Sequence, residues 1–509
     1  MRSSAALLLS GATLLVLAGC AVGPNYHSPH TDPPHAFDAA VTTDPAAPTP
    51  GQNSVDLTQW WQALGDLELD SLIDRALRAN PDLEIALTRL QEVRSQQSVL
   101  VGDALPAVSA GGFSGRGTGT DLTKAGASPA LRAGDNKGSL AQIRQVAGFS
   151  ASWEVDVFGG LRRAIEAGRA DIQAASWARN AVLTSVIADV AANYIDLRGL
   201  QQRVALLTQN IASASQLQEF EQARFEHGLT NELDLQLSAR ELGRLQAELP
   251  LLQSDLKAVQ YRIAVLLGRY PEDLATELAM PGALPNLPPN VRPGLPLDLL
   301  QRRPDIRRAE RQLAAATARI GVATANLFPR LDLIGALGTQ SGTNTAQGSH
   351  IWAFGPSVYW PLLDFGALDA LVNVADLQAH EQLVNYRMTV INAVQDADNA
   401  IARYSANQER LRDLTAAFNA SQRAVELARQ RYDRGLTDFL NVIDAERQHY
   451  ALEDQYTSAQ QSAGDAFVFL YRALGGGWES YQNIPPIHHA EPAVIAGVHR
   501  LLASDDPQK

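Results

Sequence analysis

Several residue types are scarce in this 509-residue sequence, and each scarcity excludes a class of protein. A single Cys excludes an internal disulfide and any zinc site with two or more thiolate ligands. Three Met supply few of the thioether ligands that Cu(I) prefers, so the composition does not support copper transport. A formal net charge of −13, from 42 Lys and Arg against 55 Asp and Glu, disfavours a nucleic-acid partner, which would need a basic stripe.

The one strongly apolar run lies at the start of the chain. Arg2 is followed by the largely apolar stretch Ala5–Leu17, which is too short for a spanning helix and is typical of a secretory signal peptide over residues 1–19. The tetrad Leu17-Ala18-Gly19-Cys20 resembles the bacterial lipoprotein box, which implies a covalent lipid on Cys20, and Ala21 after it implies delivery to the outer membrane. An ordinary signal peptide with a chance Cys is the alternative. Any later membrane crossing has to use β-strands, because no other uncharged stretch reaches about 20 residues.

The sequence contains an internal duplication. The segment Asn80–Leu83 (NPDL) recurs 223 residues later as Arg303–Ile306 (RPDI), and Arg224–Thr230 recurs 207 residues later as Arg431–Thr437. The change of offset falls before Phe158, so the first copy has a longer loop there. Agreement at several anchors predicts two structural repeats with the same order of elements.

Each predicted repeat holds a helix, two strands, a very long helix and a return helix. The first helices are expected over Asp66–Asp103 and Leu297–Asn326, each ended by a following proline. Apolar residues at three-and-four spacing predict long helices over 160–227 and 366–434, each on the order of 100 Å long. Periodicity of that length favours coiled-coil packing, and frequent Ala favours close approach of helices.

The expected divisions are a signal peptide (1–19), a lipid-anchored Pro-rich segment (20–63), repeat 1 (64–280, with strands about 106–118 and 141–158 and a return helix 232–268), a linker (281–296), repeat 2 (297–475, with strands about 330–341 and 350–364 and a return helix 438–475) and a tail (476–509).

The strand segments alternate between apolar and polar residues. From Phe149 to Val157 the odd positions are apolar and the even positions are polar, and Trp352, Phe354, Val358, Trp360 and Leu362 share one face in the second repeat. This pattern is typical of outer-membrane barrel strands and also of a soluble sheet on a core. The lipoprotein box and the long helices favour the membrane interpretation. Four strands per chain cannot close a barrel, so several chains have to contribute, and three is the smallest number that leaves a passage.

The sequence resembles the TolC/OprM-like outer-membrane efflux protein family, in its lipid-anchored, NodT-type branch. The resemblance rests on Cys20–Tyr26 (CAVGPNY), on the paired Pro-Asp helix starts and on the Arg-Tyr-x-x-Gly-Leu-Thr turn at Arg431–Thr437. It covers nearly all of the mature chain. It implies a mixed α/β membrane protein: a homotrimer with a 12-stranded outer-membrane β-barrel, four strands per chain, continuous with a long periplasmic α-helical coiled-coil barrel. It also implies a transporter without enzymatic activity or cofactor, which receives small molecules such as drugs from a periplasmic adaptor protein and an inner-membrane pump, of the resistance-nodulation-division type by resemblance.

The resemblance places functional residues at the periplasmic tip. Leu440 and Asp444 match the positions of an apolar ring and an Asp ring that close the tunnel, although Asn441 stands where relatives usually carry a second acid. Tyr432, Arg434 and Asp234 match positions that lock the tip between helices. The helix turns implied to contact the adaptor are Gly228, Leu229, Thr230, Gly435, Leu436 and Thr437. The alternative is that these acids and polar residues are solvated helix surface.

Other functional classes have weaker support. His27, His30 and His35 suggest a metal site, but they lie in a Pro-rich stretch, so a tether is favoured and no metal is predicted. The sequence has no Walker loop, no HExxH and no nucleophile elbow, so a hydrolase is disfavoured. A type I protein secretion duct and a non-conducting periplasmic scaffold lipoprotein remain as alternatives. The transported substrate is not predicted.

Overall fold

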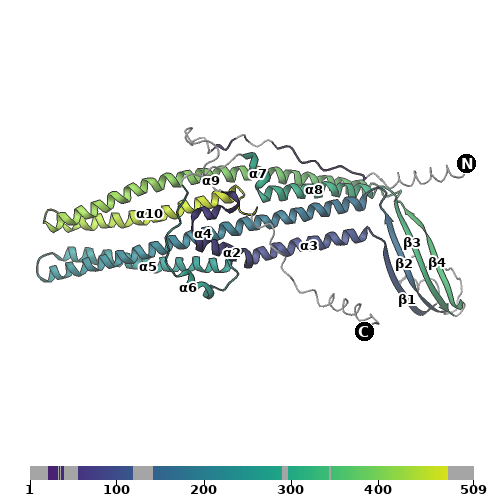
Figure 1. The fold of residues 1–509 in the computed structure, drawn as a ribbon, viewed down its shortest axis with the longest axis horizontal. Helices are drawn as coiled ribbons and strands as arrows, with labels where there is room; N and C mark the ends of the chain where they lie inside the picture. Colours follow the sequence, from purple (N-terminus) through teal and green to yellow (C-terminus); the bar gives the residue numbers. More distant parts are fainter. Residues whose placement is uncertain are drawn as a thin grey trace. The chain divides into compact units, whose positions relative to one another are not determined.

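The computed structural model describes residues 21–31, 34, 36–38, 56–117, 142–288, 296–342 and 345–479, and Figure 1 shows the order of the elements. The expected signal peptide, Cys20 and most of the expected tail lie outside the described residues. The chain forms two units. The first holds Met1–Asp32, Arg89–Trp177 and Asp305–Ile391, and the second holds Pro33–Thr88, Ala178–Pro304 and Asn392–Lys509.

The first unit contains one antiparallel sheet of four strands in the order β1-β2-β3-β4. The strands are β1 (Ala107–Gly117), β2 (Gln142–Val155), β3 (Arg330–Gly342) and β4 (Thr345–Tyr359). β1 and β4 are its two edge strands, so each is paired on one side only among the described residues. Both edges therefore present unpaired backbone donors and acceptors.

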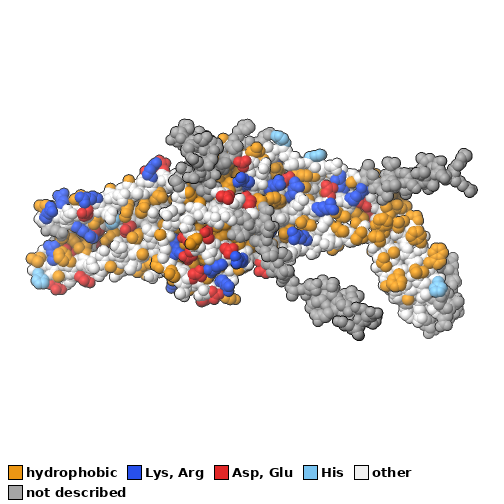
Figure 2. Space-filling model, in the orientation of Figure 1, with side chains coloured by type: hydrophobic (Ala, Val, Ile, Leu, Met, Phe, Trp, Pro, Cys, Tyr) orange, Lys and Arg blue, Asp and Glu red, His pale blue; other side chains and the backbone are white. Residues whose placement is uncertain are grey.

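The register of the strands separates the sheet into an apolar and a polar face. Phe149 pairs with Leu337, which pairs with Trp352, so these three residues form one row on the same face. Phe149, Leu337 and Trp352 are 61%, 62% and 79% exposed, and Figure 2 shows hydrophobic side chains gathered over the strands. On the other face, Ser109 and Ser150 share a hydrogen bond of 2.9 Å, and Arg330 forms an ion pair with Glu154. The sheet thus exposes apolar side chains in a row instead of burying them.

The fourth strand ends earlier than the sequence analysis expected. β4 covers Thr345–Tyr359, so Trp360 and Leu362 lie beyond it and not on its face. The last pair of the ladder joins Tyr359 to Arg330, the first residue of β3, and Pro361 has no N–H to extend it. The Trp360 indole instead donates a hydrogen bond to the Leu327 carbonyl at 3.1 Å.

Prolines also divide the two helices that the sequence analysis expected to be continuous. The range 66–103 contains α2 (Leu67–Ala79) and α3 (Pro81–Asp103), and the range 297–326 contains α7 (Pro296–Arg302) and α8 (Pro304–Ala325). Asn80 has φ −68° and ψ 126°, which is extended backbone, because the ring of Pro81 disfavours a helical residue before it. The expectation of one helix in each range was wrong, because a proline inside the range breaks the helix. The same rule correctly predicted that each helix ends before a later proline.

Two pairs of helices reverse direction in the second unit. α4 (Gly160–Glu226) and α9 (Ala367–Asp433) have 67 residues each, about 100 Å at 1.5 Å per residue, and each begins in the first unit. They return as α5 (Glu232–Leu266) and α10 (Phe439–Ala473). Shorter elements are the 3₁₀ helices η2 (Leu57–Leu64) and η5 (Pro271–Leu274), and α6 (Ala275–Leu278). None of the helices among the described residues combines the length and apolarity needed to cross a membrane.

Each unit has its own packing. In the first, Ala316 and Ile320 of α8 pack with Ala375 and Ala379 of α9, because small side chains let the helices approach closely. In the second, Trp60 of η2 stacks on Tyr471 of α10 with ring centroids 5.4 Å apart, next to Phe467. These rings are almost completely buried and fix η2 against α10.

Candidate functional site

Two helix turns in the second unit have the same backbone geometry. Gly228 and Gly435 have φ of +70° and +69°, a left-handed conformation that other residues adopt only with strain. In both turns the N–H of the following leucine donates to a carbonyl five residues earlier: Leu229 to Arg224 at 2.8 Å, and Leu436 to Arg431 at 2.9 Å. These bonds satisfy the last carbonyls of α4 and α9 in the manner of a Schellman motif.

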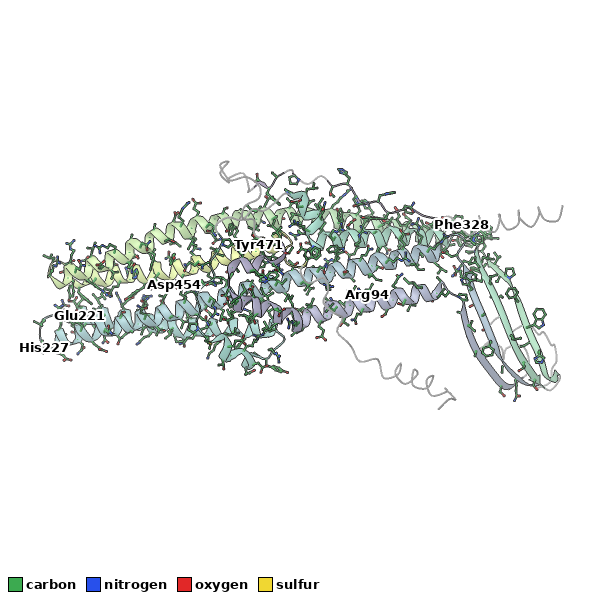
Figure 3. The ribbon with its side chains drawn as sticks, in the orientation of Figure 1. Arg94, Glu221, His227, Phe328, Asp454 and Tyr471 are labelled. Atoms are coloured by element: carbon green, nitrogen blue, oxygen red, sulfur yellow. The ribbon has the colours of Figure 1, made fainter. Side chains whose placement is uncertain are left out.

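A three-residue polar cluster joins α4 to α9 just before these turns. The Tyr432 hydroxyl of α9 donates to Glu221 Oε1 of α4 at 3.1 Å and accepts a hydrogen bond from Arg224 Nη1. Arg224 also lies 3.8 Å from Glu221, and its guanidinium is 5.2 Å from the centre of the Tyr432 ring. Figure 3 shows Glu221 near this end of α4. We call Glu221, Arg224 and Tyr432 the tip cluster.

Burial dominates the electrostatics of the tip cluster. Glu221 is 0% exposed, and its Oε2 has no hydrogen-bond partner among the described residues. Burial raises the pKa of Glu221 above its usual value, while Tyr432 and Arg224 oppose that rise. Burial and the neighbouring Glu221 raise the pKa of Tyr432 to about 12. The carboxyl is therefore a costly group to bury and depends on its two partners.

Of the three expected lock residues, one makes a contact between the two hairpins. Tyr432 contacts the other hairpin, but its partners are Glu221 and Arg224, which the sequence analysis did not name. Asp234 accepts a hydrogen bond from Thr230 at 2.7 Å within its own hairpin, and its charge also raises the pKa values of Glu221 and Tyr432. Arg434 is exposed and forms no ion pair with the described residues. The contact between the two hairpins is thus made by Tyr432 with two residues of α4, Glu221 and Arg224.

A sequence signal for Glu221 exists. Leu207, Ala214 and Glu221 are seven residues apart and are all buried on one stripe of α4. An acid on an apolar stripe requires a partner, and Arg224 lies three residues further along the same helix face. The spacing indicates that Glu221 is inside, whereas Tyr432 as its partner requires knowledge of the packing of α4 against α9.

The expected gate residues share the exposed face of α10. Leu440 is 57% exposed and Asp444 is exposed one turn later, whereas Phe439, Val442 and Ile443 are buried on the opposite side. Asp444 pairs with Arg447 at 2.8 Å on the same helix. Asn441 donates to Thr437 at 3.0 Å. An apolar and an acidic side chain are therefore available on this surface of the second hairpin.

The expected adaptor-contact residues lie at the surface of the two turns. Leu229 and Leu436 are 68% and 62% exposed, although each is a large apolar side chain at a helix end. Thr230 and Thr437 are half-buried beside them. Exposed leucines in matching positions are suited to contact another protein.

The same unit contains a cleft of about 570 Å³ between α4, α5 and α10. Its three arginines each have a carboxylate partner: Arg203 pairs with Asp454 at 2.6 Å, Arg244 with Glu248 at 2.7 Å, and Arg447 with Asp444. The charges of the cleft are satisfied within the chain, so the cleft has no built anion site.

The expectation of no metal site concerns residues that are only partly described. His35 and Cys20 lie outside the described residues. Among the described residues, no group of three or more His, Cys, Asp or Glu is placed to hold a metal ion.

Comparison with known proteins identifies the family. The family model for outer membrane efflux proteins matches residues 72–269 and 295–476. Nodulation protein T of Rhizobium leguminosarum bv. viciae is 30% identical over 493 residues, covering 96% of this chain and 97% of the relative. The probable outer membrane lipoprotein SilC of Salmonella typhimurium is 28% identical over 479 residues, covering 92% and 98%.

A solved structure agrees with these matches. The outer-membrane channel OprN superposes with a TM-score of 0.79 at 34% identity, and the match covers 90% of this chain and 100% of that structure. The resemblance predicted from the residues around Cys20 and from the paired turns is thereby confirmed. The chain belongs to the outer membrane efflux protein family.

Proposed function

We propose that three copies of this chain form an outer-membrane conduit that carries small molecules out of the periplasm as part of a tripartite efflux system. The copies would join their sheets into one barrel of 12 strands, three times the four strands of one chain. Their long helices would form the periplasmic tunnel.

The unpaired edges of the sheet carry this proposal. A membrane sheet has to satisfy its backbone internally, and each unsatisfied group in lipid costs several kcal/mol. β1 and β4 are both unpaired on their outer side among the described residues. Because all three neighbouring strand pairs are antiparallel, β1 and β4 run in opposite directions, so β4 of one copy can pair antiparallel with β1 of the next.

The two faces of the sheet suit such a barrel. The exposed row of Phe149, Leu337 and Trp352 would face lipid. The face with the Arg330–Glu154 ion pair and the Ser109–Ser150 hydrogen bond would line a wet interior. A non-conducting scaffold would have no need of a polar inner face.

The second hairpin would supply the gate. Three copies of Asp444 and Leu440 around a symmetry axis would form an acidic and an apolar ring. Like charges on the axis repel one another and attract cations, so the ring would select by charge while it narrows the tunnel. Asn441 in place of a second acid would leave this ring with less charge. The tip cluster would hold the two hairpins together at the closed tip.

The partners follow from the same arrangement. The exposed Leu229 and Leu436 would meet the helical hairpins of a periplasmic adaptor, which links the conduit to an inner-membrane pump, for which we propose the resistance-nodulation-division type. Cys20 would carry a covalent lipid that anchors the chain in the outer membrane. The name of the relative SilC, a probable outer membrane lipoprotein, supports the lipid.

Cysteine pairing between strand edges tests the assembly. Val108→Cys on β1 is combined in turn with Trp352→Cys, Phe354→Cys and Val358→Cys on β4, in cells that acylate Cys20. Within one chain these strands are separated by β2 and β3, so a disulfide between them has to join two copies. We expect oxidation to give a ladder that ends at three chains for at least one pair.

The matched control is the pair Ser150→Cys and Ala336→Cys, which are register partners on β2 and β3 of one chain. Its disulfide should leave the mass on a denaturing gel at that of one chain. The proposal fails if no β1–β4 pair links copies while the control pair oxidises, or if the ladder continues beyond three.

A further inference from the structure

The residues that follow Cys20 lie along the first unit in a fitted slot. We call Ala21–Tyr26 the N-terminal strap. The Val22 N–H donates to the Phe158 carbonyl at 3.0 Å, just before α4 begins. Gly23 has φ +87°, and a Cβ there would lie 2.4 Å from Gly321 Cα of α8. A Cβ on Gly159 would lie 2.6 Å from Ala21 Cα. The backbones approach too closely for larger residues at Gly23 or Gly159.

Arg163 donates hydrogen bonds to three residues of the strap. It is 3% exposed, in the first turn of α4. Its Nε donates to the Val22 carbonyl at 3.0 Å, and its Nη2 donates to the Gly23 carbonyl at 3.2 Å and to Asn25 Oδ1 at 2.8 Å. Its Nη1 pairs with Glu166 at 2.8 Å. A buried guanidinium therefore directs its hydrogen bonds at a segment about 140 residues earlier in the chain.

The far end of the strap is held by α8. The Tyr26 hydroxyl donates to Glu310 Oε1 at 3.2 Å, and its ring packs against the buried Ala170, Ala314 and Ala315. The Arg311 guanidinium lies 5.5 Å from the centre of that ring. The strap is thus fixed at both ends and in its middle.

The strap starts beside a group of aromatic side chains at the helical end of the sheet. Phe158 stacks on Phe328 with ring centroids 4.6 Å apart. The Trp153 indole donates to the Ala104 carbonyl, and the Trp360 indole donates to the Leu327 carbonyl, both at 3.1 Å. Tryptophan, whose apolar ring carries a polar N–H, concentrates at the boundary between hydrocarbon and water. We call Trp153, Phe158, Phe328 and Trp360 the aromatic group.

We propose that Arg163 is a positioning residue for membrane anchoring: it holds the N-terminal strap so that the acyl chains on Cys20 enter the membrane beside the aromatic group. This inference rests on the lipidation of Cys20 proposed above. Only Ala21 separates Cys20 from the first strap bond, and one extended residue spans about 3.5 Å. The strap therefore keeps the lipid close to the helical end of the sheet, and the length of the Pro-rich segment after the strap does not affect its position.

Hydrogen exchange and palmitate labelling together test the role of Arg163. In Arg163→Ala, palmitate labelling should stay at the wild-type level, because the lipoprotein box is unchanged. The amides of a peptide spanning residues 21–30 should exchange about tenfold faster or more, while the peptide 142–155 of β2 keeps its protection. Arg169→Ala, an exposed arginine on the same helix, is the matched control and should change neither signal.

Two further measurements keep the outcomes separate. Cys20→Ser should lose the label and keep the strap protected; continued labelling would overturn the lipidation proposal and not the slot. A photoreactive benzoylphenylalanine at Phe328 should capture the acylated N-terminal peptide, and Arg163→Ala should lower that capture. If Arg163→Ala fails to fold, Asn25→Ala on the strap itself should give the same loosening. The inference would be overturned if the strap amides exchange equally slowly in wild type, Arg163→Ala and Asn25→Ala. It would also be overturned if Arg163→Ala does not lower the capture of the acylated peptide.

Discussion

The two hairpin turns of the second unit share their backbone but differ in the side chains around it. Gly228 and Gly435 have nearly the same φ, and the leucines after them make hydrogen bonds of nearly the same length. At the offset of 207 residues, however, Phe225 corresponds to Tyr432, and Ala428 corresponds to Glu221. The reversal of direction is therefore common to both hairpins, whereas two of the three residues of the tip cluster, Glu221 and Tyr432, have no equivalent in the other hairpin.

The same contrast holds on the return helices. The exposed Leu233 of α5 corresponds to the exposed Leu440 of α10, but Leu237 corresponds to Asp444. Only the second hairpin thus has an acid one turn after this exposed leucine. The second hairpin therefore carries the residues proposed to narrow the tunnel, whereas the first hairpin supplies Glu221 and Arg224 of the tip cluster.

The largest effect is expected from removing the proposed gate. Asp444→Ala combined with Leu440→Ala should raise single-channel conductance in planar bilayers several-fold and weaken cation preference, because an acidic ring and an apolar ring are both lost. Leu233→Ala, at the matching position of the first hairpin, should leave conductance unchanged. An unaltered conductance in the double variant would exclude these two residues from the gate.

The next effect concerns the carboxyl of the tip cluster. Glu221→Ala should lower the local stability of the tip by about 2 kcal/mol, because it leaves a cavity and removes the acceptor of the Tyr432 hydroxyl. Hydrogen exchange of peptides around residues 215–235 measures this loss. Glu219→Ala, an exposed acid two residues earlier, should have almost no effect. Equal protection in the two variants would mean that the buried carboxyl does not stabilise the tip.

The shared turn geometry predicts equal costs at the two glycines. Gly228→Ala and Gly435→Ala should each destabilise their hairpin by about 1 kcal/mol, because alanine is strained at positive φ. No atom of the described residues lies within 4 Å of a Cβ at either position, so no clash with them should add to this cost. Thermal unfolding of the two variants checks it. A clearly larger loss at one glycine would show that the two turns are not equivalent.

Tyr432→Phe gives the second hairpin the residue that the first hairpin carries at the matching position. It should cost about 1 kcal/mol, since the ring and its packing against Phe439 remain while two hydrogen bonds are lost. The reverse change, Phe225→Tyr, should gain nothing, because Ala428 offers no acceptor at the matching position. Hydrogen exchange at the tip in both variants measures the difference. A gain from Phe225→Tyr would contradict the proposed asymmetry.

The smallest effect is a pH dependence of the tip. The pKa of Glu221 is raised in the folded chain, so between the unfolded and the folded pKa the folded state binds more protons than the unfolded state. Tip stability should therefore fall as pH rises from about 4.5, the usual value for Glu, through the folded pKa. Glu221→Gln should flatten this dependence. A tip whose exchange protection rises with pH over this range would reverse the assignment.

The sequence predicts the parts of this molecule that local rules control. The glycine turns, the lengths of α4 and α9 and the alternating face of the strands follow from backbone preference and periodicity. The break at Pro81 follows from the same rule that ended α3, yet the apolar periodicity across it led to a single expected helix. The end of β4 at Tyr359 depends on where β3 begins, and alternation in one strand does not reveal the length of its partner.

Contacts between segments distant in the chain are less predictable. The stripe of Leu207, Ala214 and Glu221 indicates a buried acid, but nothing in the local sequence identifies Tyr432 as its partner. Arg163 likewise looks like one of several arginines at the start of a helix, and only the fold brings it to the Val22 and Gly23 carbonyls. Family resemblance identified the region of the tip and not this partner set.

The protein mass of the detergent-extracted particle that conducts in bilayers tests the central claim most directly. Light scattering with correction for bound detergent should give three chains per conducting particle, because a four-stranded sheet whose two edges are unpaired among the described residues does not close alone. A conducting particle that contains a single chain would contradict the account.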